Sequence, residues 1–289
     1  MMNLGNVSLK GFIEIQNLKV TFGQKGNLVE AVSGISIHIN PGEFVSIVGP
    51  SGCGKSTLLN AVAGFVKPSS GKLLLDGQEI KGPGADRGMV FQQYSLFPWM
   101  SVRKNVEFGL KMAGKGRSEC ESAARTLLGL AGLLAFENHY PDQLSGGMRQ
   151  RVGIVRALAT SPQVLLMDEP FGALDAQTRV VMQEILTNMW QRFRLSVLFI
   201  THDIDESIFL SDRLYVMTAR PGKIKAEIEI PLPRPRVPEM ADSPEFLKLR
   251  QELHTLIREE SLRAMGGEIQ EGLGGFDVEV GPKGIKELI

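Results

Sequence analysis

Cysteine is scarce in this 289-residue sequence, which contains only Cys53 and Cys120. Domains that depend on disulfides for stability carry more cysteines in a shorter chain, so we do not expect a disulfide framework. The simplest compartment for such a chain is a reducing cytoplasm.

Long apolar runs and an excess of one charge are also lacking. The longest apolar runs, such as residues 164–167, are far short of the roughly 20 residues that a membrane-spanning helix needs, and the N-terminus shows no secretion signal. Lys plus Arg equals Asp plus Glu at 32 each, so no net charge favours nucleic acid or an anionic membrane surface. Any attachment to a membrane must therefore come from a partner.

What the sequence does have is a glycine-rich loop, Gly-Pro-Ser-Gly-Cys-Gly-Lys-Ser-Thr, at residues 49–57. The apolar residues before it predict a buried parallel strand, and residues 55–64 predict the helix that follows. Its glycines let backbone N–H groups turn onto phosphate oxygens, and the helix N-terminus adds a partial positive charge. Lys55 is placed to reach the β and γ phosphates, and Ser56 offers a hydroxyl to Mg²⁺. A glycine-rich turn of no function is the alternative, and the complete motif argues against it.

We therefore expect one group of residues to bind a nucleotide: Gly49, Ser51, Gly52, Cys53, Gly54, Lys55, Ser56 and Thr57.

Paired carboxylates follow a second buried strand at residues 164–167. Asp168 would hold Mg²⁺, directly or through water. Glu169 is then free to act as the base that polarises water, a role that contributes about 10²- to 10⁴-fold in rate. The pair favours hydrolysis over transfer to a substrate hydroxyl. A solvated strand end does not explain why the acids coexist with a complete phosphate loop.

A second glycine-led helix begins at Ser145-Gly146-Gly147. Ser145 is a good N-cap, and the glycines again free N–H groups for an anion. The spacing leaves open whether this helix faces a nucleotide in the same chain or in a second copy, and a plain capped helix is a further alternative.

Three weaker candidates have structural alternatives. Phe22 could stack on an adenine ring or pack at its strand end. His202 follows the core strand at 196–201, where α/β sheets place ligands, although a lone histidine is usually structural. The apolar loop at 96–100 favours a docking surface or local core packing about equally.

The remaining pattern predicts how the chain is organised. Apolar and polar residues alternate along 12–22 and 31–39, which predicts two strands of an antiparallel β layer. The pattern of residues 94–161 predicts helices. A hairpin joins strands at 213–217 and 224–230, followed by a stiff, solvated, proline-rich linker at 231–238. A last segment, residues 239–289, opens with a helix capped by Ser243 and ended by Gly266-Gly267, with a short strand near 276–280.

Five further motifs follow the phosphate loop along the chain: Gln92, Leu-Ser-Gly-Gly-Met-Arg-Gln at 144–150, Met-Asp-Glu-Pro at 167–170, Ala-Leu-Asp at 173–175 and His202. With the loop, they resemble the ATP-binding cassette (ABC) ATPases over residues 12–230. The resemblance implies an α/β fold: a P-loop NTPase core with a mixed sheet flanked by helices, an antiparallel β layer and an inserted helical subdomain. It also implies ATP and Mg²⁺ as cofactors.

Roles for single residues follow from the same resemblance. Two cassettes would pair head to tail, so that Ser145 and Gly147 of one chain close over ATP held by Lys55 of the other. Gln92 would be catalytic, would reach the Mg²⁺ site and would link it to the helical insert. His202 would contact the γ-phosphate. The other ATP-contacting positions implied are Phe22, Gly146, Gln150 and Asp175, the last communicating between the two sites.

A closer resemblance is to the ATPase subunits of bacterial nitrate, sulfonate and taurine importers. The features that carry it are Phe97-Pro98-Trp99, Phe171-Gly172-Ala173-Leu174-Asp175 with Gln177-Thr178-Arg179, Ala219-Arg220-Pro221-Gly222, and Pro231-Leu-Pro-Arg-Pro-Arg236 leading into Ser-Pro-Glu-Phe. It implies a peripheral protein at the cytoplasmic face of the inner membrane that drives uptake of a small anion. Its implied partners are a second copy, a permease and, indirectly, a solute-binding protein.

Two alternatives remain open. A soluble ABC ATPase acting on nucleic acid or ribosomes is disfavoured, because about 90 residues separate Lys55 from Ser145 and leave no room for a long coiled coil. The segment from residue 239 onward could also be a regulatory binding module, although its apolar stripe of Phe246, Leu249, Leu253 and Leu256 is more often a packed helix.

Overall fold

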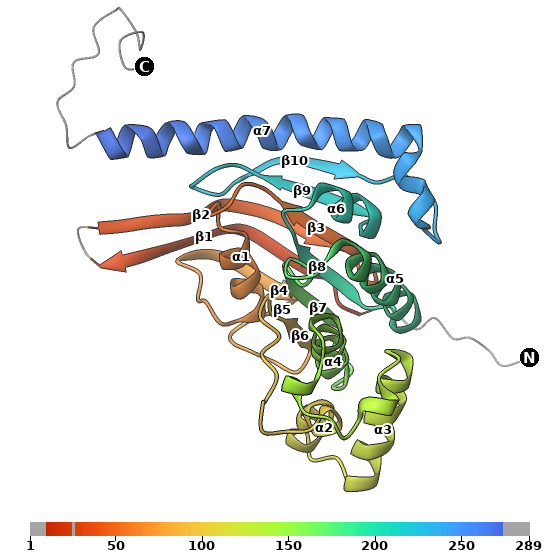
Figure 1. The fold of residues 1–289 in the computed structure, drawn as a ribbon. Helices are drawn as coiled ribbons and strands as arrows, with labels where there is room; N and C mark the ends of the chain where they lie inside the picture. Colours follow the sequence, from red (N-terminus) through yellow and green to blue (C-terminus); the bar gives the residue numbers. More distant parts are fainter. Residues whose placement is uncertain (1–9, 25–26, 274–289) are drawn as a thin grey trace, which may run out of the picture.

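The computed structural model describes residues 10–24 and 27–273 (Figure 1). An antiparallel sheet of four strands has the order β2-β1-β4-β5. Its strands are β1 (Ile13–Gln24), β2 (Asn27–Ile39), β4 (Ser70–Leu75) and β5 (Gln78–Glu79). The alternation at 12–22 and 31–39 therefore predicted this layer correctly, because one face of each strand is buried and the other is not.

A second sheet of six strands has the order β10-β9-β3-β8-β7-β6. Its strands are β3 (Phe44–Val48), β6 (Arg87–Val90), β7 (Val164–Asp168), β8 (Ser196–Ile200), β9 (Arg213–Met217) and β10 (Ile224–Glu229). All neighbours pair in parallel except β10, which is antiparallel to β9. The expected mixed sheet is confirmed. Because both faces are covered, β3, β8 and β9 are buried at every residue.

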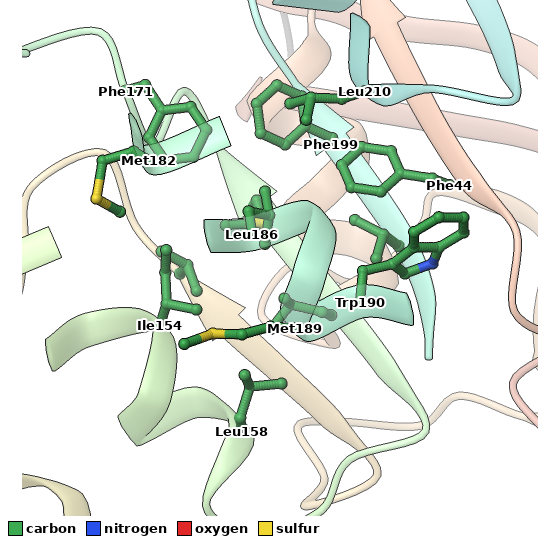
Figure 2. Close-up of a cluster of buried hydrophobic side chains, with 14 of the residues drawn as sticks. Phe44, Ile154, Leu158, Phe171, Met182, Leu186, Met189, Trp190, Phe199 and Leu210 are labelled. Atoms are coloured by element: carbon green, nitrogen blue, oxygen red, sulfur yellow. The ribbon is translucent and has the colours of Figure 1, made fainter. Parts of the chain in front are cut away.

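The mixed sheet separates two hydrophobic clusters, and β3 contributes to both. Val45 and Ile47 point toward α1 (Lys55–Ala63) and the antiparallel sheet, whereas Phe44 and Val48 point to the opposite side. This division follows from the two-residue period of a strand. Figure 2 shows part of the cluster on the Phe44 side, the main hydrophobic cluster, in which Leu186 and Trp190 of α5 (Ala176–Phe193) approach Phe44 and Phe199.

The helical segment predicted between residues 94 and 161 contains α2 (Val102–Met112), α3 (Arg117–Leu130), η1 (Leu134–Phe136), η2 (Pro141–Gln143) and α4 (Gly146–Leu158). In Figure 1, α2 and α3 lie at the end of the molecule opposite α7. Helix α4 contacts both α2 and β6, so it joins the insert to the mixed sheet.

The proline-rich segment at 231–238 is exposed at all of its prolines, as expected of a solvated linker, but two of its side chains pack on the core. Leu232 is buried in the main hydrophobic cluster, and Arg236 is only 6% exposed. Arg236 Nη1 donates to the carbonyl oxygens of Ile208, Phe209 and Ser211 at 2.9, 3.0 and 2.6 Å, at the C-terminal end of α6 (Ile204–Leu210). These carbonyls have no partner within the helix, so the linker serves as its cap.

The described part of the chain ends with η3 (Pro238–Asp242) and α7 (Pro244–Leu273). Helix α7 lies beside β10 in Figure 1. Ser243 caps α7 as expected, since its Oγ accepts from Phe246 N at 3.3 Å. The prediction that Gly266-Gly267 ends the helix is wrong, because α7 continues to Leu273. The strand expected near 276–280 lies outside the described residues.

The apolar stripe of α7 packs on its own chain. Phe246, Leu249 and Leu253 are buried in the main hydrophobic cluster, and α7 contacts α6 and β9. Within the part of the chain that the structure describes, no helix combines the length and the apolar character needed to cross a membrane.

Candidate nucleotide site

The glycine-rich loop lies between β3 and α1, as predicted. Gly52 and Gly54 have φ values of 71° and 106°, which side chains other than glycine rarely adopt. A Cβ on Gly54 would stand 2.5 Å from the carbonyl oxygen of Ala31, so the loop also needs glycine for space. The Lys55 ammonium turns back onto the loop, donating to the carbonyls of Gly49 and Pro50 at 2.8 and 2.9 Å.

The side chain of Cys53 is buried beside this lysine, with its Sγ 3.9 Å from Lys55 Nζ. Burial raises the pKa of the Cys53 thiol. Cys53 and Cys120 are both buried, and neither forms a disulfide in the described part of the chain.

The paired acids reach the loop from the end of β7. Ser56 Oγ donates to Asp168 Oδ1 at 3.0 Å. Burial raises the pKa of Asp168, and the hydrogen bond from Ser56 partly opposes this rise. A hydroxyl and a carboxylate are hard oxygen ligands, so this pair fits Mg²⁺ chemistry.

Glu169 contacts both of the other catalytic candidates, Gln92 and His202. Its Oε2 accepts from Gln92 Nε2 at 3.3 Å and lies 3.1 Å from His202 Nδ1. The three residues follow β6, β7 and β8, which are adjacent in the sheet. Because parallel strands end at one edge, residues distant in sequence converge there.

An open cavity of about 290 Å³ lies in front of the loop. Its lining includes Phe22, Val29 and Ala31 from the antiparallel sheet, Ser51, Gly52, Gly54, Lys55, Ser56 and Thr57 from the loop and α1, and Glu169 and Arg220. Phe22 is 46% exposed and forms part of this wall, so it is not a packed strand end. Arg220 was not among the expected site residues.

The second glycine-led helix lies elsewhere. Ser145 caps α4 by accepting from Met148 N at 3.3 Å, and Ser145 and Gly147 line a separate cavity with residues of α5. No residue of the phosphate loop lines that cavity. Within the described part of one chain, the structure therefore does not bring the two phosphate-ready helix starts together.

Gly146, Gln150 and Asp175 lie near that second helix start. Gly146 approaches the Tyr94 hydroxyl, where a Cβ would stand 3.0 Å from it. Asp175 caps α5 by accepting from Thr178 N at 2.9 Å, and this bond lowers the pKa of Asp175. Gln150 is fully buried, and its amide has no hydrogen-bond partner among the described residues. Its side chain thus presents no surface to a nucleotide, contrary to expectation.

The loop, the acids and the converging polar residues together define a P-loop ATPase. A family profile described as ABC transporter matches residues 32–172. The nitrate import ATP-binding protein NrtD of Synechocystis sp. is 51% identical over 252 residues, which cover 85% of this chain and 95% of that protein. The taurine import ATP-binding protein TauB of Rhizobium johnstonii is 48% identical over 260 residues, covering 87% and 99%.

Solved structures agree. A dimeric bacterial ABC transporter cassette matches with a TM-score of 0.68 and 34% identity over 75% of this chain and 98% of that chain. A dimeric cassette in a post-hydrolysis state, bound to ADP and Pi, matches with a TM-score of 0.67 and 33% identity over the same shares. This chain belongs to the ABC transporter ATP-binding family and is an ABC ATPase.

Proposed function

We propose that this chain is the ATP-hydrolysing subunit of an importer for a small anion such as nitrate, a sulfonate or taurine. The observation that carries the proposal is the similarity to nitrate and taurine import ATP-binding proteins over more than four-fifths of the chain. In this proposal a separate permease forms the path for the solute, a solute-binding protein delivers it, and this chain works at the cytoplasmic face of the membrane.

Hydrolysis is assigned to the residues that converge beside the phosphate loop. Glu169 takes the role of base toward the attacking water, and Gln92 and His202 both contact the same carboxylate oxygen and so fix its direction. Ser56 and Asp168 are the residues that would hold Mg²⁺, with Gln92 nearby; the metal neutralises phosphate charge. His202 is the residue proposed to contact the γ-phosphate.

A second copy of the chain is proposed to complete each site. Ser145 and Gly147 line a cavity to which the phosphate loop contributes no residue, and Gly146 stands between them in the first turn of α4. We propose that the N–H groups of this turn bind the nucleotide of another cassette. The dimeric state of both similar cassettes supports this arrangement. Asp175, at the start of the helix beside them, is placed to pass a signal between the two sites.

The permease is proposed to dock on the loop at residues 96–100. Trp99 is 71% exposed, although Phe97 packs against Phe108 with ring centroids 4.6 Å apart. The side chain of Asn105 is fully buried and fixes the backbone of this loop. Its Oδ1 accepts from Phe97 N at 2.9 Å, and its Nδ2 donates to Phe97 O at 3.2 Å. A large exposed indole on a rigid base is a suitable anchor for a partner helix.

Co-purification with the cognate permease in detergent tests this function. We expect the wild-type chain to be retained and Trp99→Ala to be retained less, because the anchor is lost, while ATPase activity without the permease stays unchanged. Leu262→Ala, which removes a side chain 61% exposed on α7, is the control and is retained like wild type. Failure of the wild-type chain to bind any permease would overturn the proposal.

The alternative of a soluble ABC ATPase acting on nucleic acid or ribosomes draws no support from the relatives named above. Salt-sensitive binding of DNA or RNA at physiological ionic strength would restore it.

A further inference from the structure

The turn at residues 219–222, between β9 and β10, lies against the phosphate loop. Gly222 N donates to Ala31 O at 3.1 Å, and Gly222 O accepts from Ser33 N at 2.9 Å. A Cβ on Gly222 would stand 2.2 Å from the carbonyl oxygen of Cys53. Only glycine permits so close an approach, so the turn and the loop form one packed unit.

Arg220 extends from this turn into the nucleotide cavity. Its side chain is exposed, its Nη2 donates to the carbonyl of Gly52 at 3.3 Å, and it lines the cavity together with Phe22 and Ser56. Within residues 10–24 and 27–273, no carboxylate forms an ion pair with it. The guanidinium therefore places a positive charge in the cavity beside the phosphate loop. Only its Nη2 donates a hydrogen bond in the described part of the chain, so its other N–H groups can donate to a ligand.

Helix α7 also binds this turn, through a side chain of its own. Glu260 is 1% exposed, and its Oε2 accepts from Ala219 N at 3.0 Å. Its Oε1 pairs with Lys225 Nζ at 2.8 Å and with Arg263 Nη1 at 2.9 Å, which compensates the buried charge. A buried carboxylate of the C-terminal helix therefore holds the residue next to Arg220.

We propose that Arg220 binds the phosphates of ATP and that Glu260 positions it, so that α7 sets the affinity of the site for nucleotide. A guanidinium is well suited to phosphate, because it is always charged and offers several N–H donors in a fixed fork. The C-terminal segment then acts through the 219–222 turn and needs no ligand of its own.

Isothermal titration of the purified full chain with ATP, ADP and adenosine tests the role of Arg220. We expect Arg220→Gln to weaken binding of ATP and ADP about tenfold, the value of one charge-assisted hydrogen bond, and to leave adenosine unaffected. Arg220→Lys keeps a charge and recovers part of the loss.

Lys55→Ala is measured alongside, because the inference rests on the assignment of this cavity to ATP. If Lys55→Ala weakens ATP binding and Arg220→Gln does not, the role of Arg220 is overturned while the site assignment stands. If neither variant weakens ATP binding, the site assignment itself is wrong.

The positioning role of Glu260 is tested with Glu260→Leu, which removes the acceptor of the Ala219 N–H. Lys225 keeps its pair with Glu259 in this variant, and a thermal denaturation curve checks that the variant is folded before ATP is titrated. We expect ATP affinity to fall about fivefold, as for one lost hydrogen bond, and Glu260→Gln, which keeps an oxygen acceptor, to retain it. Glu259→Leu is the matched control. Glu259 pairs with the same Lys225 but does not contact Ala219, so its loss leaves ATP affinity unchanged.

The double variant Arg220→Gln, Glu260→Leu decides whether Glu260 acts through Arg220. If it does, the second substitution causes no further loss of ATP affinity, because the residue being positioned is already gone. An equal additional loss in the double variant, or an equal loss in Glu259→Leu, would overturn the positioning role.

Discussion

Glu169 is held both by its backbone conformation and by two neighbouring side chains. Its φ of 42° is rare for a residue other than glycine, and its carboxylate is contacted by both Gln92 and His202. Backbone strain of this kind persists where the surrounding structure fixes it, and it is concentrated at functional sites. The side chain is thereby held toward the cavity that it lines.

Glu169→Gln should bind ATP normally but lose about 10²- to 10⁴-fold in turnover, because the amide keeps the shape of the side chain and removes the base. Steady-state ATPase assays and ATP titration measure the two properties separately. Glu184→Gln, which changes an exposed acid on α5, serves as the control and keeps full activity. Full ATPase activity in Glu169→Gln would show that the base lies elsewhere.

Glu206 is a second unusual acid, outside the site. It is 4% exposed, and burial raises its pKa from 4.5 to about 7, although a hydrogen bond from Gln183 at 3.3 Å opposes this. The folded state therefore binds a proton more tightly than the unfolded state, so this residue stabilises the fold least above pH 7.

Chemical denaturation between pH 4.5 and 8 checks this assignment. The contribution of Glu206 to the free energy of unfolding should be complete below pH 4.5 and be lost as the pH rises through about 7. Glu206→Gln, which cannot ionise, should flatten this part of the profile. An unchanged slope in the variant would mean that Glu206 is not the titrating group.

At the scale of elements, the sequence predicted what depends on neighbours along the chain. The strand, loop and helix around residues 49–57 and the acids after β7 are local patterns, since burial on both faces yields continuous apolar runs. The first two strands of the antiparallel layer were also predicted from a local pattern, the alternation of apolar and polar residues that results when only one face of a strand is buried.

What the sequence could not predict depends on packing between distant segments. Gln150 belongs to a motif but faces the interior, and Arg220 reaches the cavity only because the 219–222 turn folds onto the loop. The feature of the sequence that could have pointed to Arg220 was the Ala-Arg-Pro-Gly motif at 219–222, in which it is the one charged residue. Helix α7 tolerates two glycines at about 1 kcal/mol each, a cost that its many other residues offset.

The proline-rich segment offers a prediction at this scale. Arg236→Ala should lower the free energy of unfolding by about 2–3 kcal/mol, because the carbonyls at the end of α6 lose their donor in a buried place. Urea denaturation measures the change. Lys248→Ala, at an exposed position of α7, is the control and changes stability by less than about 0.5 kcal/mol. Equal stability of Arg236→Ala and wild type would restore the picture of a solvated linker.

At the scale of the whole molecule, one chain carries two separate cavities that the proposed dimer would join. The phosphate loop and its acids line one cavity, and Ser145 and Gly147 line another. Two copies arranged head to tail would join the first cavity of each copy with the second cavity of the other. ATP would then act as the bridge between cassettes, and its hydrolysis would release them to drive the permease.

The most direct test of this account is the sedimentation of Glu169→Gln, in which bound ATP is not consumed. The account predicts a dimer with ATP and Mg²⁺ and a monomer with ADP. Adding Ser145→Arg, which places a large side chain where the second cassette would meet the nucleotide, should abolish the dimer and leave ATP binding to the monomer intact. A dimer that forms equally well with Ser145→Arg, or without ATP, would contradict the account.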